Sequence, residues 1–454
     1  MRRRDFIQKT GAMTIGGIVI PSIVPASVMG KNAPSNRINI GMIGTGRQAI
    51  NVNLKDGFLK LDNCRVIAVN DVDSWRMNCA KDLVNESYSA KKGGKYNGVK
   101  SYDDYRDLLD NKDIDAVMIS TTDHWHAPIG IAAAKAKKHI SIEKALSVCY
   151  SHSKALSEAV KVNNVSNRLD SEFRSNEYFR KAVEIVRNNQ IGTVKNVIVG
   201  VPAPLNGSAI GPQPVMKIPQ ELNYDMWLGP AFEAPYTVKR VHDPKEINTR
   251  PGWMRIEDYC NGMITNWGAH LWDIALWGIN KEYELPVSVN GDGTFSSGLW
   301  NTINSFDIEY KYADGLMINF IIDKPYVKFI GENGWVKISY PNKLEASNEE
   351  IVNYKLGEGD ISFSDTLSDK EDFLKAIETN SQSLEPIEVG HNVFATTSFG
   401  LISVKLQREI HWDNSTEKFI DDTAANAMLN CPFRGKWIDK DVIDWMNKYQ
   451  KVDL

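Results

Sequence analysis

The sequence predicts an α/β protein in two parts, a doubly wound parallel sheet followed by a second domain that also contains strands. Two observations carry this prediction. Between residues 38 and 143, short apolar runs alternate with helical stretches, which is the pattern of parallel strands joined by crossover helices. Between residues 305 and 340, apolar and polar side chains alternate and Gly-containing turns separate the runs, which indicates further strands.

Length and composition fit this architecture. The chain has 454 residues, of which 42% are hydrophobic and 24% charged, and this is enough for two domains with substantial cores. The formal net charge is −4. A mildly acidic chain without a long basic run binds polyanions poorly, so we expect no nucleic-acid partner.

The five cysteines are scattered along the chain: Cys64, Cys79, Cys149, Cys260 and Cys431. They form no Cys-x-x-Cys pair and show no metal-ligand spacing, and five are few for a chain of this length. The sequence therefore predicts neither a disulfide framework nor a metal site. Stability is expected to come from the hydrophobic core.

The first thirty residues have the order of an export signal. Three arginines precede a short apolar run from Ala12 to Val24, and small residues follow near Ala26 to Gly30. This order is typical of a cleaved leader, and the run is too short and Gly-rich for a membrane span. Because Arg3–Lys9 is similar to a twin-arginine signal, we expect residues 1–30 to direct export to the periplasm. An ordinary secretory signal is the alternative.

A glycine-rich turn follows the first predicted strand, Ile38–Ile43. It reads Gly44-Thr45-Gly46-Arg47-Gln48-Ala49, a GxGxxA loop. Gly44 allows the tight turn, Gly46 lets the backbone approach a pyrophosphate, and Ala49 lets the following helix pack closely. The N-terminus of that helix offers free N–H groups to the phosphates. The segment from Gly44 to Gln48 is therefore predicted to bind a dinucleotide.

An acid at the end of the second predicted strand bears on which dinucleotide is bound. The strand Arg65–Asn70 is followed by Asp71. A carboxylate at this place accepts hydrogen bonds from the adenosine ribose hydroxyls and repels a 2′-phosphate, so the sequence predicts NAD as the cofactor. Arg47 and Arg76 offer charge to a 2′-phosphate and keep NADP as the alternative.

Polar residues follow two later strands, Ala116–Ser120 and His139–Ile142. Ligands bind at the carboxyl ends of parallel strands, so we expect these residues to face the nicotinamide end of the cofactor. The candidates are Thr121, Asp123, Trp125, His126, Glu143 and Lys144. His124 and His126 form an HxH pair, but the sequence supplies no third ligand for a metal ion.

Taken together, these segments resemble the glucose–fructose oxidoreductase / inositol dehydrogenase (Gfo/Idh/MocA) family. The likeness rests on IGMIGTG, TTDHWHAPI and SIEKALS in the first part, and on GMITNWGAHLWDIALWGI and HNVFATTSFGLISVKLQREIHWD later. It runs from about Arg37 to Trp437 and is greatest to the long, exported branch of the family.

The resemblance implies a fold and a division into domains. A Rossmann domain, placed at residues 37–150, precedes a substrate and oligomerisation domain at residues 151–437 that is built on an open, mostly antiparallel sheet. Four alternating runs agree with that sheet: Ser305–Tyr312, Gly315–Ile322, Tyr326–Ile330 and Gly334–Tyr340. Residues 438–454 are expected to form a helical tail, and the protein to form a homo-oligomer, a dimer or tetramer.

The resemblance also implies a catalytic pair. Lys144 matches the lysine of the family's Glu-Lys-Pro motif and would steady the substrate oxygen as hydride leaves; Ala145 replaces the proline, which puts its unusual peptide geometry in doubt. His270 matches the histidine of an Asp-x-x-x-His motif and would act as general acid and base. Asn266 replaces the aspartate, and an amide cannot stabilise an imidazolium, so we expect a weaker base or a different proton route.

Two segments are expected to contact the substrate. Glu172 and Arg174 follow a predicted strand, and Arg174 matches a family arginine near the active site; alternatively, the two residues pair with each other. The irregular stretch from Pro202 to Arg255 is rich in Pro, Gly and aromatic residues. Aromatic faces suit pyranose rings, so Trp253 and Arg255 are the candidates there.

These predictions support an NAD-dependent oxidoreductase that moves hydride to or from a ring hydroxyl of a sugar, glycoside or polyol, with C3 as the candidate position. The alternative is a redox-assisted glycosidase or lyase with tightly bound NAD, which passes through a 3-keto intermediate. A second alternative is a catalytically inactive sugar-binding relative, supported only by Asn266 and Ala145. The first changes nicotinamide absorbance, the second releases sugar without net change, and the third binds without turnover.

Overall fold

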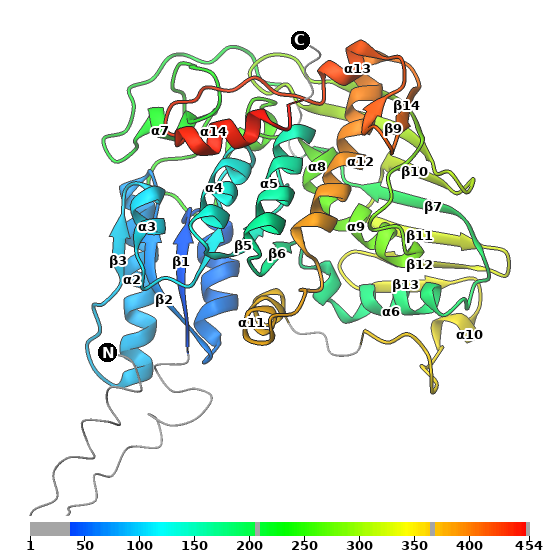
Figure 1. Cartoon of the computed structure of the whole chain (residues 1–454), viewed down its shortest axis with the longest axis horizontal. Helices are drawn as coiled ribbons and strands as arrows, with labels where there is room; N and C mark the ends of the chain where they lie inside the picture. The colour runs from blue at the N-terminus through cyan, green and yellow to red at the C-terminus, as the bar shows by residue number, and fades with distance from the viewer. Residues whose placement is uncertain (1–36, 205–208, 364–367, 451–454) are drawn as a thin grey trace, which may run out of the picture. The chain divides into compact units, whose positions relative to one another are not determined.

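The computed structural model describes residues 37–204, 209–363 and 368–450. The leader predicted at residues 1–30 lies outside these described residues. From Ile38 onward the chain forms two sheets flanked by helices (Figure 1). Among the described helices, none combines the length and the hydropathy that crossing a bilayer requires.

The first sheet has six parallel strands in the order β3-β2-β1-β4-β5-β6. Its strands are β1 Ile38–Ile43, β2 Cys64–Asn70, β3 Lys100–Tyr102, β4 Ala116–Ile119, β5 His139–Glu143 and β6 Asn167–Asp170. The helical segments between them are η2 Ala49–Gly57, η3 Phe58–Lys60, α2 Ser74–Lys92, α3 Tyr105–Asp110, α4 Asp123–Lys135 and α5 Tyr150–Asn163.

Successive side chains of these strands point to opposite faces, and each face has its own core. On one face, Met42 and Met118 pack with residues of η2 and α2. On the other, Val117 and Ile119 pack with residues of α3, α4 and α5. Helices therefore cover both faces of the sheet, as a doubly wound fold requires.

Two boundaries differ from those expected. β6 pairs with β5, so the first sheet continues beyond residue 150, where we had ended the first domain. The strand predicted before Glu172 is therefore part of the first sheet, although the sequence analysis had assigned it to the domain at residues 151–437. Helix α4 begins at Asp123, four residues before the helix expected at Ala127–Ala136, so Trp125 and His126 lie in a helix.

The second sheet has nine strands in the order β13-β12-β11-β7-β10-β9-β8-β14-β15. β10 and β7 are parallel, whereas the other neighbouring pairs are antiparallel. The strands are β7 Val194–Val201, β8 Ser288–Phe295, β9 Ile303–Lys311, β10 Met317–Ile322, β11 Tyr326–Gly331, β12 Trp335–Ser339, β13 Lys343–Ala346, β14 Ile410–Asp413 and β15 Lys418–Phe419. The mostly antiparallel sheet expected for this part of the chain is confirmed.

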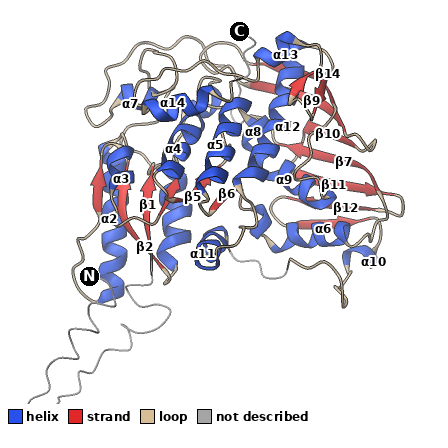
Figure 2. Cartoon of the chain, viewed as in Figure 1, coloured by secondary structure: helices blue, strands red, loops and turns tan. Residues whose placement is uncertain are grey.

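The helices of this part are divided between the two sheets (Figure 2). They are η4 Phe173–Ser175, α6 Glu177–Arg187, α7 Tyr224–Leu228, η5 Gly252–Arg255, α8 Met263–Asn266, α9 Gly268–Ile279, α10 Glu349–Val352, α11 Asp369–Thr379, α12 Ile387–Leu406, α13 Thr423–Ala427 and α14 Lys440–Asn447. α12 packs against both α5 and β8. One apolar helix thus joins the cores of the two sheets.

The C-terminal segment returns to the first sheet. Trp445 Nε1 donates a hydrogen bond to the carbonyl of Ala155 at 2.8 Å, and Lys135 pairs with Asp441 at 2.6 Å.

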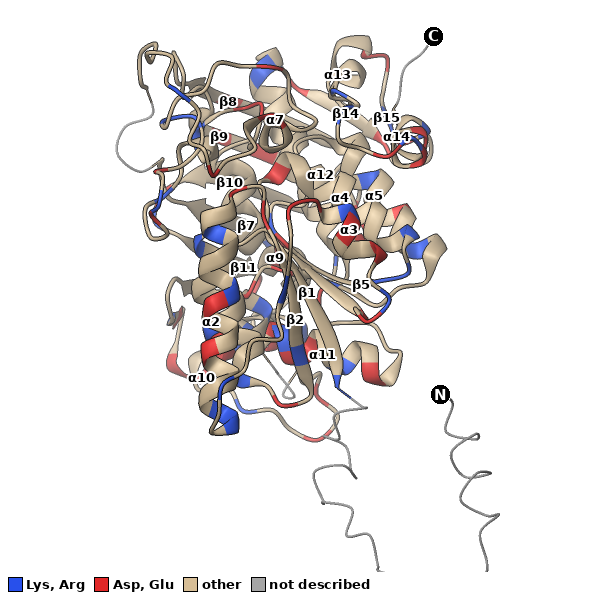
Figure 3. Ribbon diagram, turned by 90° about the vertical axis from the view of Figure 1, so that its left-hand side faces the viewer, with Lys and Arg blue, Asp and Glu red and all other residues tan. Residues whose placement is uncertain are grey.

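Figure 3 shows acidic and basic residues interspersed along α2, without a basic face in this view.

One covalent feature contradicts the cysteine analysis. A disulfide joins Cys149 to Cys431, across 282 residues of sequence, although no disulfide framework was expected. Sequence spacing carried no signal for it, because residues this far apart meet only through the fold. Cys64, Cys79 and Cys260 are not part of a disulfide.

Candidate active site

A cavity of about 200 Å³ lies at the carboxyl ends of β1, β2, β4 and β5. It is lined by twelve of the residues that the sequence analysis selected: Gly44, Gly46, Arg47, Gln48, Asp71, Thr121, Asp123, Trp125, Glu143, Lys144, Trp253 and Asn266. Six others are not part of its lining: Thr45, His126, Glu172, Arg174, Arg255 and His270. The residues of the first group border the space that a ligand would fill, and those of the second group do not.

The two glycines of the turn lack a side chain for different structural reasons. Gly44 has a φ of +85°, and a Cβ there would lie 2.5 Å from the carbonyl oxygen of Ser120. Gly46 needs no such freedom, since the nearest atom to an added Cβ would be 3.9 Å away. Gly46 lines the cavity, so its missing side chain leaves space for a ligand rather than for the chain itself. These residues fit the pyrophosphate of a dinucleotide.

Asp71 ties the second strand to this turn. Its carboxylate accepts hydrogen bonds from the backbone N–H of Thr45 at 2.7 Å, from the Thr45 hydroxyl at 2.9 Å and from the backbone N–H of Asp73 at 2.9 Å. Burial, and then the charge of Asp73, raise the pKa of Asp71. Thr45 is fully buried, so its contribution is to position the acid that lines the cavity.

Arg76 and Arg47 are the two cations near that acid. The guanidinium of Arg76 donates to the carbonyl of Glu246 at 2.5 Å and lies 3.8 Å from the carboxylate of Asp73. Arg76 is therefore held by the protein. Arg47 is half-buried, and burial and the charge of Arg250 lower its pKa.

The peptide bond between Lys144 and Ala145 is cis. The unusual geometry that the missing proline had put in doubt is therefore present. His126 Nδ1 donates to the carbonyl of Ala145 at 2.7 Å. His126 is fully buried, and it supports the backbone beside Lys144 instead of lining the cavity.

Glu143, directly before the lysine, is a buried acid. Asn53 Nδ2 donates to its carboxylate at 3.0 Å and lies 3.2 Å from the Ser120 hydroxyl. Burial, followed by the charge of Asp170, raises the pKa of Glu143 to about 8. The acid is therefore protonated at neutral pH and adds no full negative charge beside Lys144. Asn53 was not selected from the sequence, because nothing in η2 marked one asparagine above another.

His270 lies close enough to Lys144 for the lysine charge to act on it. Burial, and then Lys144, lower the pKa of His270 to about 3. Its Nδ1 bonds the backbone carbonyl of Ser171, and its ring stacks on Phe173 with centroids 4.7 Å apart. A carbonyl only accepts, so Nδ1 carries the proton and Nε2 is left as an acceptor.

Asn266 lines the cavity, whereas His270 is 9% exposed and is not among the lining residues. The two are four residues apart, a spacing that would place them on one face of a continuous helix. The structure divides this helix into α8 and α9 at Trp267, and the N–H of His270 bonds the carbonyl of Trp267. Asn266 also borders a second, smaller cavity with Arg255.

Arg174 does not contact the cavity, and its expected substrate role is wrong. It is buried and binds Asp273 at 2.6 and 2.8 Å, Glu282 at 2.7 Å and the carbonyl of Leu384 at 2.9 Å. Its alternative pairing with Glu172 is also not found: Glu172 instead accepts a hydrogen bond from Gln48 at 2.8 Å.

Asp123 opens helix α4 and lines the cavity. It is 1% exposed, and its Oδ2 has no hydrogen-bond partner among the residues that the structure describes. Burial raises its pKa to about 7, against the opposing charge of Lys144. An unpartnered buried carboxylate oxygen is unusual, since buried polar groups are normally satisfied.

Trp125 and Trp253 both line the cavity, whereas Arg255 does not. Trp125 Nε1 donates to the carbonyls of Met226 and Trp227 at 3.1 and 3.2 Å, so its ring is held at the cavity edge. Trp253 is half-buried and lines the cavity. Arg255 instead lies over the ring of Trp300, 4.5 Å from its centroid, and burial and Arg250 lower its pKa.

Comparison with known proteins identifies the fold's relatives. Residues 38–168 match a family model described as an oxidoreductase family NAD-binding Rossmann fold. Residues 208–439 match the model of that family's C-terminal alpha/beta domain. The chain belongs to the Gfo/Idh/MocA oxidoreductase family. It carries the NAD-binding Rossmann domain of that family.

Curated Gfo/Idh/MocA relatives match over short segments. A levoglucosan dehydrogenase of Pseudarthrobacter phenanthrenivorans is 34% identical over 110 residues, which are 24% of this chain and 28% of the relative. A myo-inositol 2-dehydrogenase of Thermotoga maritima is 29% identical over 155 residues, 34% of this chain and 42% of the relative. A glycosyl hydrolase family 109 protein of Shewanella pealeana is 31% identical over 162 residues, 33% of this chain and 34% of the relative. The chain thus spans less than half the length of these relatives.

Solved structures share the Gfo/Idh/MocA fold over most of the chain. An aldose-aldose oxidoreductase from Caulobacter crescentus is 16% identical with a TM-score of 0.58, and the match covers 83% of this chain and 99% of that one. Levoglucosan dehydrogenase in complex with NADH and L-sorbose gives the same identity, TM-score and coverage.

Residues that the sequence analysis did not select as candidates also line the cavity. Thr249, Pro251 and Met254 come from the irregular stretch before α8, and Met226 and Trp227 come from α7. Their spacing has no periodicity, so only the folded loop shows which of them face the cavity.

Proposed function

We propose that the protein is an NAD-dependent oxidoreductase that transfers hydride between nicotinamide and a ring hydroxyl of a sugar, glycoside or polyol. The observation that carries this proposal is the cavity that begins at the Gly44–Gly46 turn and ends at Lys144, with His270 within the electrostatic reach of that lysine. Bound NAD supplies a hydride acceptor or, when reduced, a hydride donor.

Lys144 stabilises the substrate oxygen. A hydroxyl that loses hydride from its carbon and its own proton passes through a state with negative charge on oxygen. A lysine ammonium that lines the cavity opposes this charge most strongly where the charge develops. Because Glu143, the residue before Lys144, is in its neutral form, it does not offset the positive charge of the lysine.

His270 receives the hydroxyl proton. Its Nδ1–H is held by the carbonyl of Ser171, which leaves the Nε2 lone pair as the acceptor. A pKa lowered to about 3 keeps the imidazole neutral through the physiological range. Asn266 lines the cavity beside this helix and binds a second hydroxyl through its amide. Asp123, which lines the cavity, is the alternative acceptor.

The sugar class rests on the relatives. Two of the curated proteins that match parts of the chain are named for levoglucosan and myo-inositol, and both are cyclic compounds rich in hydroxyls. Trp253 lines the cavity and offers an apolar face to a pyranose ring. The position oxidised, for which we propose C3, and the export of the protein to the periplasm are parts of the same proposal.

A second function is favoured by one observation. Several curated relatives are glycosyl hydrolase family 109 proteins, which makes a redox-assisted glycosidase or lyase the alternative. In that reaction, oxidation at C3 acidifies the C2 hydrogen, and loss of that proton and of the leaving group forms a double bond. In a glycosidase water adds across this bond, in a lyase it remains, and the ketone is then reduced again. The nicotinamide ends the cycle as it began.

Two measurements test these functions, and the second one separates them. The purified protein is denatured and any released dinucleotide is identified by mass; NAD supports the proposal. The native protein is then incubated with NAD and a panel of sugars, polyols and glycosides, with nicotinamide absorbance and product mass read together. Net reduction of NAD with a ketone product supports the dehydrogenase. Sugar release without net reduction supports the alternative, and neither change with any compound contradicts both.

A further inference from the structure

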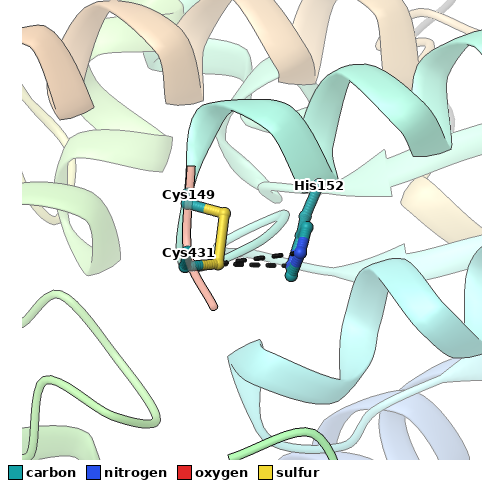
Figure 4. Close-up of side chains that lie close together, drawn as sticks. All are labelled: Cys149, His152 and Cys431. Atoms are coloured by element: carbon teal, nitrogen blue, oxygen red, sulfur yellow. Dashed lines mark hydrogen bonds between the residues drawn. A yellow bond between two sulfur atoms is a disulfide. The ribbon is translucent and has the colours of Figure 1, made fainter. Parts of the chain in front are cut away.

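Cys149, His152 and Cys431 form a cluster outside the cavity described above (Figure 4). The two cysteines are joined by the disulfide, and His152 Nδ1 lies 3.4 Å from Cys431 Sγ. The sulfur and nitrogen atoms that could serve as ligands all lie within 4.8 Å of one another. Two sulfurs and an imidazole thus meet at one point.

Helix geometry explains two members of the cluster. Cys149 is the N-cap of α5 and His152 lies in its first turn. Residues three apart on a helix face the same side, so the Cys-x-x-His spacing directs both side chains to one point. Cys431 arrives from the C-terminal segment, which is fixed there by a 3.0 Å hydrogen bond from Ser151 N–H to the Leu429 carbonyl.

His152 provides the second, independent observation. Its side chain is 2% exposed, and within the described residues both ring nitrogens have only the sulfur of Cys431 as a hydrogen-bond partner. His124 and His126, the buried histidines of α4, bond backbone carbonyls instead. A disulfide requires no polar neighbour, whereas a metal site requires a further nitrogen or sulfur ligand directed at the two sulfurs.

Space for a further ligand lies beside the cluster. A cavity of about 320 Å³ is bordered by all three side chains and by the polar residues Glu257, Asp258 and Asn261. It is large enough to hold several waters. Three protein ligands and one water complete the tetrahedral coordination that Zn²⁺ prefers.

We propose that the reduced form of this cluster binds one Zn²⁺ ion through Cys149 Sγ, an imidazole nitrogen of His152 and Cys431 Sγ, with water as the fourth ligand. A dithiol reductant breaks the S–S bond by supplying two electrons and two protons, and becomes a disulfide itself. Zinc binding then releases both thiol protons to solvent. Re-oxidation by a small disulfide returns the two electrons to that compound, re-forms the protein disulfide and expels the ion.

Both states hold the C-terminal segment against α5, which begins shortly after Lys144 in the chain. The cluster does not line the dinucleotide cavity, so this inference does not depend on the proposed function.

The test uses the full chain and Zn²⁺ alone. The protein is reduced with a dithiol, stripped with a chelator, freed of both without air, and dialysed against micromolar Zn²⁺. Elemental analysis should find about one ion per chain in the reduced protein and none in the disulfide form. Cys431→Ser and His152→Ala should weaken binding at least about tenfold. Cys79→Ser, which changes a thiol outside the cluster, should bind as the wild type does.

Because a cysteine variant can fail to fold, Co²⁺ provides a second measurement on the wild type. Thiolate ligands give Co²⁺ an intense sulfur-to-metal charge-transfer band, which should appear in the reduced protein and vanish on oxidation. Reduced wild type that binds no Zn²⁺ and gives no such band would overturn the proposal. So would a folded Cys431→Ser variant that binds Zn²⁺ as tightly as wild type.

Discussion

The guanidinium of Arg174 binds both carboxylate oxygens of Asp273, with Nε 2.8 Å from Oδ2 and Nη2 2.6 Å from Oδ1. Both side chains are almost fully buried. Arg174 follows β6 of the first sheet, and Asp273 lies in α9, three residues after His270. The pair therefore sets where the helix of His270 sits relative to the first sheet.

The first prediction concerns this pair. Arg174→Met should lower the free energy of unfolding by about 3–5 kcal/mol, because it leaves the Asp273 carboxylate buried without its main partner. Urea unfolding measures the change. The double variant Arg174→Met, Asp273→Leu should recover part of the loss, since position 273 no longer carries a charge and Glu282 keeps Arg187 at 3.8 Å. An Arg174→Met protein as stable as wild type would contradict a structural role for this arginine.

A second prediction separates the two glycines of the turn. Gly46→Ala should weaken NADH binding about tenfold or more by placing a methyl group where the pyrophosphate approaches, while stability changes by less than about 0.5 kcal/mol. Gly44→Ala is the matched control: it should destabilise the protein by more than about 1 kcal/mol, because its φ of +85° and the Ser120 carbonyl exclude a side chain. Fluorescence titration with NADH and thermal unfolding give the two readouts. Equal effects of both variants on stability would argue against this assignment.

The third prediction follows from the raised pKa of Asp123, about 7 against an ordinary value near 3.8. Between about pH 4 and pH 7 the folded state keeps a proton that the unfolded state has lost. The stability that this group contributes is therefore complete below pH 4 and is lost as the pH rises to 7. Asp123→Asn removes the loss, so its stability relative to wild type should be greater at pH 8 than at pH 4, by roughly 2–4 kcal/mol. Urea unfolding at both pH values tests this, and a difference independent of pH would refute it.

A fourth prediction concerns cofactor choice. Asp71→Asn removes the negative charge at the cavity but leaves an oxygen that can accept from Thr45. The ratio of NADPH to NADH affinity should rise about tenfold or more, because the repulsion of a 2′-phosphate is gone. Binding titrations with both reduced cofactors measure the ratio. An unchanged ratio would mean that the held guanidinium of Arg76, and not Asp71, governs the choice.

Local sequence signals correctly predicted that the glycine turn and Asp71 lie at one cavity. Gly44, Gly46 and Asp71 lie at strand ends, and strand ends of a parallel sheet converge on one edge whatever the details of packing. The strands between residues 303 and 339 were also predicted to within two residues of their observed ends, because their side chains alternate and glycine turns separate them.

Contacts between residues far apart in the sequence could not be predicted from local patterns. The role of Arg174 depends on Asp273, 99 residues away, and that of Cys149 on Cys431, 282 residues away. The orientation of His270 relative to Asn266 depends on how α8 and α9 divide at Trp267. Each of these outcomes is decided by tertiary packing, which overrides local pattern.

The most direct test of the account measures turnover and cofactor binding on the same proteins, with a substrate found in the panel. Lys144→Ala and His270→Ala should each reduce the rate of nicotinamide reduction by about 10²–10⁴-fold, while NADH affinity stays within about threefold of wild type. Turnover at the wild-type rate in both variants, with NADH bound normally, would contradict the assignment of the reaction to Lys144 and His270.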